Sequence, residues 1–159
     1  MRRNLYWISL FLCLFATTFC SCPANAEDLT HRFGIGLNYP GVSVKYGLSQ
    51  KFSIEGKYQT ADKINVMGPR LYFVIKDCGK LNLLAGLEAD YVTFTGDVSK
   101  GSGLAGELFV GGEYFITRNL SFLLDIGPAY VALSDTATSE SVNGLDSVLN
   151  MGINYYFGK

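Results

Sequence analysis

The chain has 159 residues with 13 Lys and Arg against 14 Asp and Glu, a formal net charge of −1. This length fits one domain, and the absence of a basic surplus argues against a nucleic-acid partner. Glycine is frequent, at 18 residues, and 14% of the residues are aromatic, which together favour strands over helices.

The first 26 residues have the pattern of a secretory signal peptide. Arg2 and Arg3 form the basic start, residues 5–19 form an apolar run short of a spanning helix, and Ala24-Asn25-Ala26 is a small-x-small cleavage site. We expect cleavage after Ala26, which divides the chain into a signal peptide (1–26) and one domain (27–159). An uncleaved anchor and a lipoprotein signal ending at Cys22 are the alternatives.

The mature chain would keep Cys78 alone, with 11 basic and 14 acidic residues. A single cysteine forms no internal disulfide and supplies no cysteine-based metal spacing, so Cys78 is interpreted as a turn residue. We predict no metal site and no cofactor.

Eight strands are predicted from the alternation of apolar and polar residues and from the turn residues between them. They cover residues 31–39, 42–48, 52–60, 67–76, 81–95, 104–115, 120–133 and 145–157. The connections at 49–51, 77–80 and 117–119 are short, whereas those at 61–66, 96–103 and 134–144 are longer. An even strand number with short turns on one side is typical of an all-β, eight-stranded, antiparallel up-and-down transmembrane β-barrel.

The two faces of these strands differ sharply. One face is apolar, and the other carries the charges, which a shift of one residue would exchange. An eight-stranded barrel is just wide enough for side chains to fill it, so we predict a charge network that fills the lumen. Its expected members are Arg32, Lys45, Glu55, Lys57, Arg70, Lys76, Glu88, Asp90, Glu107, Glu113 and Asp125. A narrow passive channel for small or hydrophobic solutes is the alternative.

Aromatic residues on the apolar face lie near the two ends of the strands, as in the interfacial girdles of membrane barrels. The predicted outer girdle contains Tyr39, Tyr58, Tyr91 and Tyr130, and the periplasmic girdle contains Tyr46, Phe52, Tyr114 and Phe157. The partner of this face would be outer-membrane lipid.

No catalytic residues are predicted. Glu88 and Asp90 share a face, but a place in the charge network explains them without acid–base chemistry. His31, the single histidine, would lie at the periplasmic start of the first strand, away from any constellation at the outer rim.

The last strand resembles the carboxy-terminal signal that the barrel assembly machinery recognises, through Asn150, Gly152, Tyr155 and Phe157. Residues 112–121 and 48–56 resemble the strand–turn–strand units of small OmpA/OmpX-like outer-membrane barrels. The resemblance covers the mature chain, although Gly158 and Lys159 follow the terminal aromatic residue. It implies a non-enzymatic protein of the Gram-negative outer membrane, which meets the assembly machinery during biogenesis.

The preferred interpretation of the chain is a structural or surface-interaction role. The sequence does not identify an extracellular ligand. If one exists, we expect it to bind the polar last loop, which contains Asp135, Thr136, Thr138, Ser139, Glu140 and Ser141. A secreted, soluble lipocalin-like barrel that binds an apolar ligand inside is the alternative of a different class.

Overall fold

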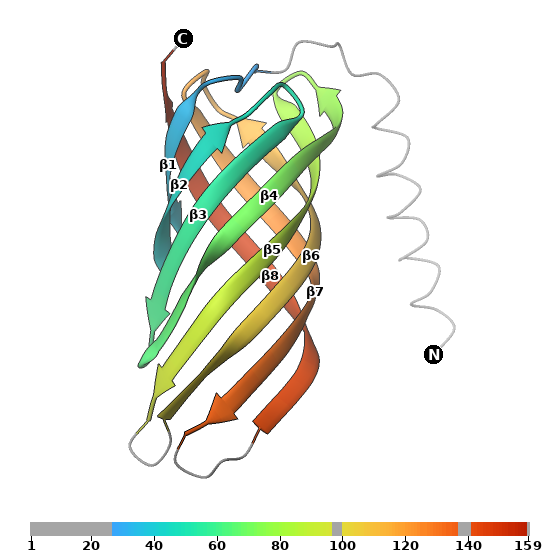
Figure 1. Ribbon diagram of the computed structural model, residues 1–159. Coiled ribbons are helices and arrows are strands. Elements are labelled where there is room, and N and C mark those ends of the chain that lie inside the picture. Colours follow the sequence, from blue (N-terminus) through green and yellow to red (C-terminus); the bar gives the residue numbers. More distant parts are fainter. Residues whose placement is uncertain (1–26, 97–99, 137–140, 159) are drawn as a thin grey trace, which may run out of the picture.

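The protein is a closed ring of eight antiparallel strands (Figure 1). The computed structural model describes residues 27–96, 100–136 and 141–158. The strands are β1 (Phe33–Asn38), β2 (Gly41–Gly47), β3 (Phe52–Ala61), β4 (Ile64–Cys78), β5 (Leu81–Thr95), β6 (Lys100–Phe115), β7 (Leu120–Asp135) and β8 (Ser141–Phe157). The predicted signal peptide, residues 97–99 and 137–140 of two predicted loops, and Lys159 lie outside the described residues, and with them the predicted contact residues Thr138, Ser139 and Glu140.

Each strand pairs with its neighbours in the chain, and β1 pairs with β8 to close the ring. The strand pairing also sets the stagger of the barrel. If paired residues are followed from strand to strand around the ring, starting at Phe122 of β7, the path returns to β7 at Ala132, ten residues further along the chain. A stagger of this kind goes with strands tilted by about 35–45° from the barrel axis. The predicted all-β, eight-stranded up-and-down barrel is therefore confirmed.

Burial follows the period-2 alternation of the sequence. In β1 and in the first seven residues of β3, exposed and buried residues alternate one by one. The exposed positions form an apolar outer face, and the buried ones point into the lumen. Phe33 pairs with Phe157, so the first and last strands meet at one end, which we call the terminal end; the opposite end is the loop end.

The three longer connections were predicted wrongly, because most of their residues belong to strands. β3 and β4 are joined by Asp62 and Lys63 alone, both with positive φ (48° and 69°) as in the tight turns of hairpins. β6 begins at Lys100, and β7 and β8 extend to Asp135 and Ser141.

The start of β6 was predicted as a loop because its sequence is rich in glycine. A Cβ on Gly103 would lie 2.0 Å from the carbonyl oxygen of Ala132, so glycine marks a close approach of two strands there and not a loop. Smaller corrections concern the ends of two strands: β1 begins at Phe33 instead of His31, and Cys78 is the last residue of β4 instead of a turn residue.

The wall of the barrel has unequal height. β1 and β2 have 6 and 7 residues, whereas β4 to β8 have 15 to 17. Figure 1 shows the long strands continuing past the β1–β2 turn toward the loop end. In the described part of the chain, no helix combines the length and the apolar character needed to cross a membrane.

Candidate functional site

The lumen contains ten of the eleven predicted network residues, all of them buried: Arg32, Lys45, Glu55, Lys57, Arg70, Glu88, Asp90, Glu107, Glu113 and Asp125. They come from β2 to β7 and from the segment just before β1. Burying so many charges is tolerable only where they are paired and hydrogen-bonded. Hydrogen bonds and ion pairs join nine of them into three groups, centred on Glu113 toward the terminal end, on Glu55 beside β1 and β2, and on Arg70 toward the loop end, while Arg32 pairs with Glu27.

Lys76 was predicted wrongly, because its side chain is exposed. The register of β4 against β5 shifts between Val74 and Lys76. A bulge of this kind adds one residue to one strand and reverses the faces beyond it, which simple alternation does not reveal.

Glu113 is the centre of the group toward the terminal end. Its Oε2 accepts a hydrogen bond from Lys45 Nζ at 2.9 Å, and both side chains are 1% exposed. Its Oε1 accepts hydrogen bonds from Ser121 Oγ at 2.5 Å, Tyr156 OH at 2.5 Å and Asn154 Nδ2 at 3.1 Å. One carboxylate thus joins side chains of β2, β6, β7 and β8.

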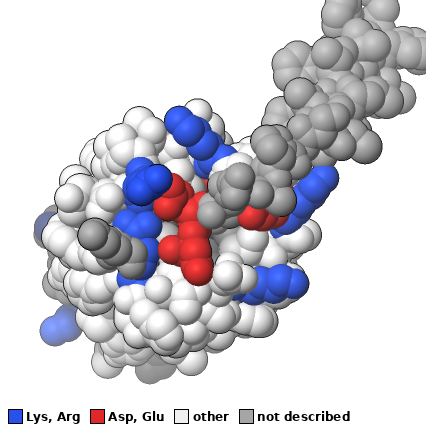
Figure 2. Space-filling model, turned by 90° about the horizontal axis from the view of Figure 1, so that it is seen from above, with Lys and Arg blue, Asp and Glu red and all other residues white. Residues whose placement is uncertain are grey.

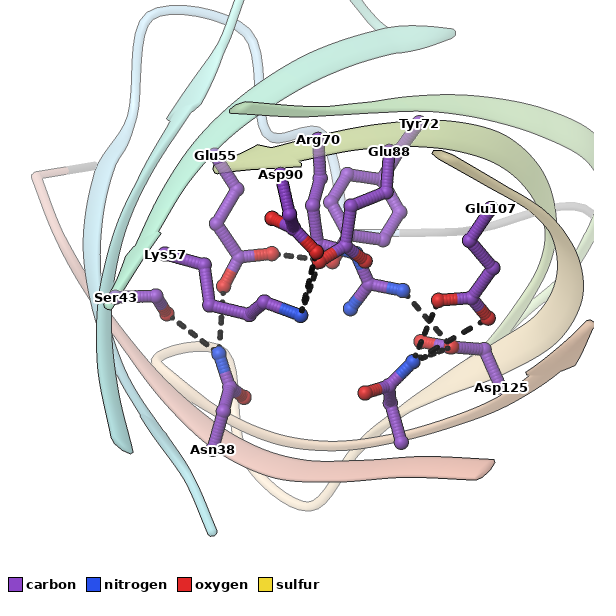
Figure 3. Close-up of polar contacts among 11 residues, drawn as sticks. Asn38, Ser43, Glu55, Lys57, Arg70, Tyr72, Glu88, Asp90, Glu107 and Asp125 are labelled. Carbon is purple, nitrogen blue, oxygen red and sulfur yellow. Dashed lines mark hydrogen bonds and ion pairs between the residues drawn. The ribbon is translucent and has the colours of Figure 1, made fainter. Parts of the chain in front are cut away.

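Glu55 connects the network to the β1–β2 side of the wall. Its carboxylate accepts hydrogen bonds from the Tyr72 hydroxyl and, at 2.9 Å, from Asn38 Nδ2. The same Asn38 amide donates to Ser43 Oγ at 2.8 Å. Figure 3 shows these side chains converging from β1, β2, β3 and β4.

Arg70 is the centre of the group toward the loop end. Its Nε lies 2.7 Å from Glu88 Oε2, and its Nη2 donates to Asp125 Oδ1 at 2.8 Å, so it spans the lumen from β4 to β7 (Figure 3). Lys57 Nζ pairs with Glu88 and lies 3.9 Å from Asp90 Oδ2.

Asn150 extends this group to β8. Its Nδ2 donates to Asp125 Oδ1 at 3.0 Å and to Glu107 Oε2 at 3.2 Å. The side chain thus links two carboxylates that come from β6 and β7. The network therefore reaches every strand of the ring.

The cations also lie on aromatic rings. Lys45 Nζ is 4.1 Å from the centroid of the Tyr72 ring, and the Arg70 guanidinium carbon is 4.2 Å from that of Phe109. Such contacts favour a buried cation. Tyr72, Phe109, Leu84 and Leu123 form an apolar cluster within the lumen.

Sequence reasoning missed several uncharged members of the site: Asn38, Ser43, Tyr72, Phe109 and Ser121. Each lies on the inward face of its strand, so the alternation that marks the charges marks these residues too. Aromatic residues were considered mainly for the outer girdles, so Tyr72 and Phe109 were left out of the lumen.

The segment before β1 covers the terminal end of the lumen. Leu29 packs with Phe115 and Tyr156, and Arg32 lies over the Tyr156 ring with its guanidinium carbon 5.6 Å from the centroid. Hydrogen bonds from the Thr30 hydroxyl and backbone N–H hold the pKa of Asp28 below its usual range. Figure 2 shows acidic side chains over the middle of this end, with basic side chains around them.

The eight predicted girdle residues are all exposed on the outer face, from 37% for Tyr46 to 89% for Tyr39. Of the predicted assembly-signal residues, Asn150 and Gly152 point inward, and Tyr155 and Phe157 point outward. With its charges inside and its apolar side chains outside, the barrel has the opposite polarity to the lipocalin-like alternative.

The Glu88–Asp90 pair and His31, which the sequence analysis considered for catalysis, have ordinary contacts in the structure. Glu88 and Asp90 both face Lys57, and the exposed His31 has its Nδ1 3.2 Å from the Tyr46 hydroxyl. Among residues 27–96, 100–136 and 141–158, no group of three His, Cys, Asp or Glu residues could hold a metal ion.

Comparisons with known proteins agree on the fold and go no further. No protein-family model matches the chain, and no curated protein matches it. Among solved structures it is similar to the N-terminal β-barrel domain of Pseudomonas aeruginosa OprF, with a TM-score of 0.51 and 12% sequence identity. The similarity covers 80% of this chain and 98% of that domain. At this level of identity it supports the eight-stranded barrel architecture alone.

Proposed function

We propose that this chain is a non-enzymatic, eight-stranded barrel of the Gram-negative outer membrane, with outer-membrane lipid around it and a lumen sealed by the charge network. The distribution of charge supports this best: ten charged side chains are buried inside the ring, and more than thirty large apolar side chains are exposed outside it. A soluble protein rarely exposes so much apolar surface, whereas lipid is its natural partner.

Export belongs to the same proposal. The signal peptide would be cleaved after Ala26, and the barrel assembly machinery would insert the domain of residues 27–159. The wall supports insertion because every strand pairs with two neighbours in a closed ring, which satisfies the backbone groups of the paired stretches within lipid.

Because a sealed lumen cannot conduct solutes, we propose a structural role for the barrel. Arg70 bridges β4 and β7, and Glu113 ties four strands together, so the side chains occupy the path that a solute would need. The strands take up most of the predicted outer loops, which leaves little surface for a broad adhesive contact.

Cell fractionation tests the location. We expect the protein in the outer membrane, with a faster-migrating folded band on gels that converts to the unfolded band on heating. Recovery as a soluble periplasmic protein would refute the proposal.

Planar-bilayer recording tests the seal. We expect no conductance above background from purified, folded protein. The variant Arg70→Ala/Tyr72→Ala, verified as folded by the same gel shift, is the matched control in which current should appear. Steady conductance from the unaltered protein would favour the channel alternative instead.

A further inference from the structure

The wall of the barrel has an opening on one side, above the β1–β2 turn. β1 pairs with β8 only as far as Asn38, opposite Gly152, whereas β7 pairs with β8 on to Ser141. Among the described residues, β8 therefore has a partner on one side alone between residues 141 and 151. Residues 141–147 are all exposed, although their side chains alternate between the two faces. We call this opening the side notch.

The notch lies at the height of the apolar outer face. Six residues of β1, at about 3.3 Å per residue and a tilt of about 40°, rise roughly 15 Å along the barrel axis. The apolar band of a membrane barrel is about 25 Å tall. On β7 the outward apolar residues continue from Leu120 to Tyr130, and Tyr130 pairs with Leu145, which lies beyond the β1–β2 turn.

The inner face changes character where the notch begins. Beyond Asp90, Glu107 and Asp125, most inward positions of the long strands are apolar, with the exposed Asp146 opposite Ala129 as the charged exception. We call the apolar ones the inner apolar wall: Val92, Ala105, Ala129, Val131 and Val148. Ala129 is buried, and Val131 and Val148 are half-buried. The charge network thus forms the floor of an apolar trough that opens sideways.

Apolar grooves lead to this opening from the outer face. A groove of about 540 Å³ surrounds the β1–β2 turn, lined by Tyr39, Pro40, Phe122 and Met151 among others. A second groove, of about 1010 Å³, runs along β1 to β4 and shares Leu37, Val42 and Ile153 with the first. The apolar surface therefore continues from the outer face to the edge of β8.

We propose that the acyl chain of a lipid from the surrounding membrane enters through the side notch and lies against the inner apolar wall. This inference rests on the proposed insertion in a membrane. The notch would expose the free backbone edge of β8 to hydrocarbon, where unpaired N–H and C=O groups are costly. An amphiphile fits both surfaces, because its polar end can lie against the β8 edge at the loop end, past Leu145, while its acyl chain covers Val131 and Val148.

Tryptophan fluorescence can test this directly, because the single tryptophan of the chain, Trp7, lies in the predicted signal peptide. Three single-tryptophan variants of the mature barrel are compared: Val131→Trp on the inner apolar wall, Tyr130→Trp on the outer face, and Phe109→Trp in the sealed lumen. Each is folded into vesicles of phosphatidylcholine with or without bromine in the middle of its acyl chains. Bromine quenches tryptophan on contact.

We expect Val131→Trp to lose at least half as large a fraction of its fluorescence as Tyr130→Trp, and Phe109→Trp to lose almost none. Quenching of Val131→Trp no greater than that of Phe109→Trp, with Tyr130→Trp quenched, would overturn the lipid site and leave the membrane barrel intact. Absence of quenching in Tyr130→Trp would instead overturn the insertion itself. Val148→Trp provides a second inner position if Val131→Trp does not give the folded band.

Discussion

For the buried Lys45–Glu113 ion pair, we predict that removing Glu113 destabilises the barrel more than removing Lys45 does. The variant Glu113→Gln keeps the size of the side chain but leaves the Lys45 ammonium buried without its counter-charge. The variant Lys45→Met leaves the Glu113 carboxylate with three hydrogen-bond donors, from Ser121, Asn154 and Tyr156.

The contacts set the expected magnitudes. Removing one partner so that a buried charge is left uncompensated costs about 3–5 kcal/mol, which we expect for Glu113→Gln. Losing one hydrogen bond to a charged group costs about 1.5–3 kcal/mol, which we expect for Lys45→Met, because the anion stays solvated by its donors. The ring of Tyr72 lies 4.1 Å from Lys45 Nζ in the unaltered protein, so it offers the stranded cation no new compensation.

Equilibrium urea unfolding of the barrel in lipid vesicles measures both changes. The double variant Lys45→Met/Glu113→Gln should be more stable than Glu113→Gln alone, because the uncompensated ammonium is gone. The reasoning would be refuted if Lys45→Met cost as much as Glu113→Gln, or if the double variant showed the sum of the two single losses.

Three more predictions use the same unfolding assay. Gly152→Ala should cost about 1–3 kcal/mol, because its Cβ would lie 1.9 Å from Oδ1 of the buried Asn38, whereas Gly56→Ala should stay within about 0.5 kcal/mol because a Cβ there meets nothing within 4 Å. Equal losses in these two variants would contradict the assigned faces. Arg70→Met should cost about 3–5 kcal/mol, because two buried carboxylates lose a cation; a loss below 1 kcal/mol would mean that the network does not depend on it. Lys76→Met should change stability by less than about 0.5 kcal/mol, since Lys76 is exposed, and a loss like that of Lys45→Met would place it inside.

The sequence was sufficient to predict the inward face for ten of the eleven charged residues of the network, and the reason is the period of the strand. Lys76 is the exception, because it follows the bulge in β4. Lys45 and Glu55 lie on the same face as their strands' polar residues whatever the register between strands, so alternation alone places them inside. Their partners depend on the register and on the stagger of the closed ring. Arg70 meets Asp125 across the lumen, 55 residues later in the chain, and no local pattern contains that information.

The height of the wall was not predictable from the same pattern. Residues 101–103 and 141–144 are mostly polar or glycine, as loops are, yet they pair with β7 as regular strands. A strand that leaves the apolar band loses the apolar half of its alternation, and its sequence then resembles a loop. The side notch depends on this difference, because it exists only where long strands stand beside a short hairpin.

The inward glycines explain how so many long side chains fit in a ring of eight strands. A Cβ on Gly34 would lie 2.8 Å from the Tyr156 ring, and one on Gly86 would lie 2.2 Å from the Phe109 ring. Small residues beside large ones are how narrow barrels fill their interior. Tyr156 can therefore reach Glu113, and Phe109 can support Arg70, only because the wall beside each of them carries no side chain. The packing of the charge network therefore depends on these glycines. We expect Gly86→Ala to displace the Phe109 ring that lies against Arg70, and so to weaken the ion pairs of Arg70 with Glu88 and Asp125, although Gly86 itself makes no ion pair.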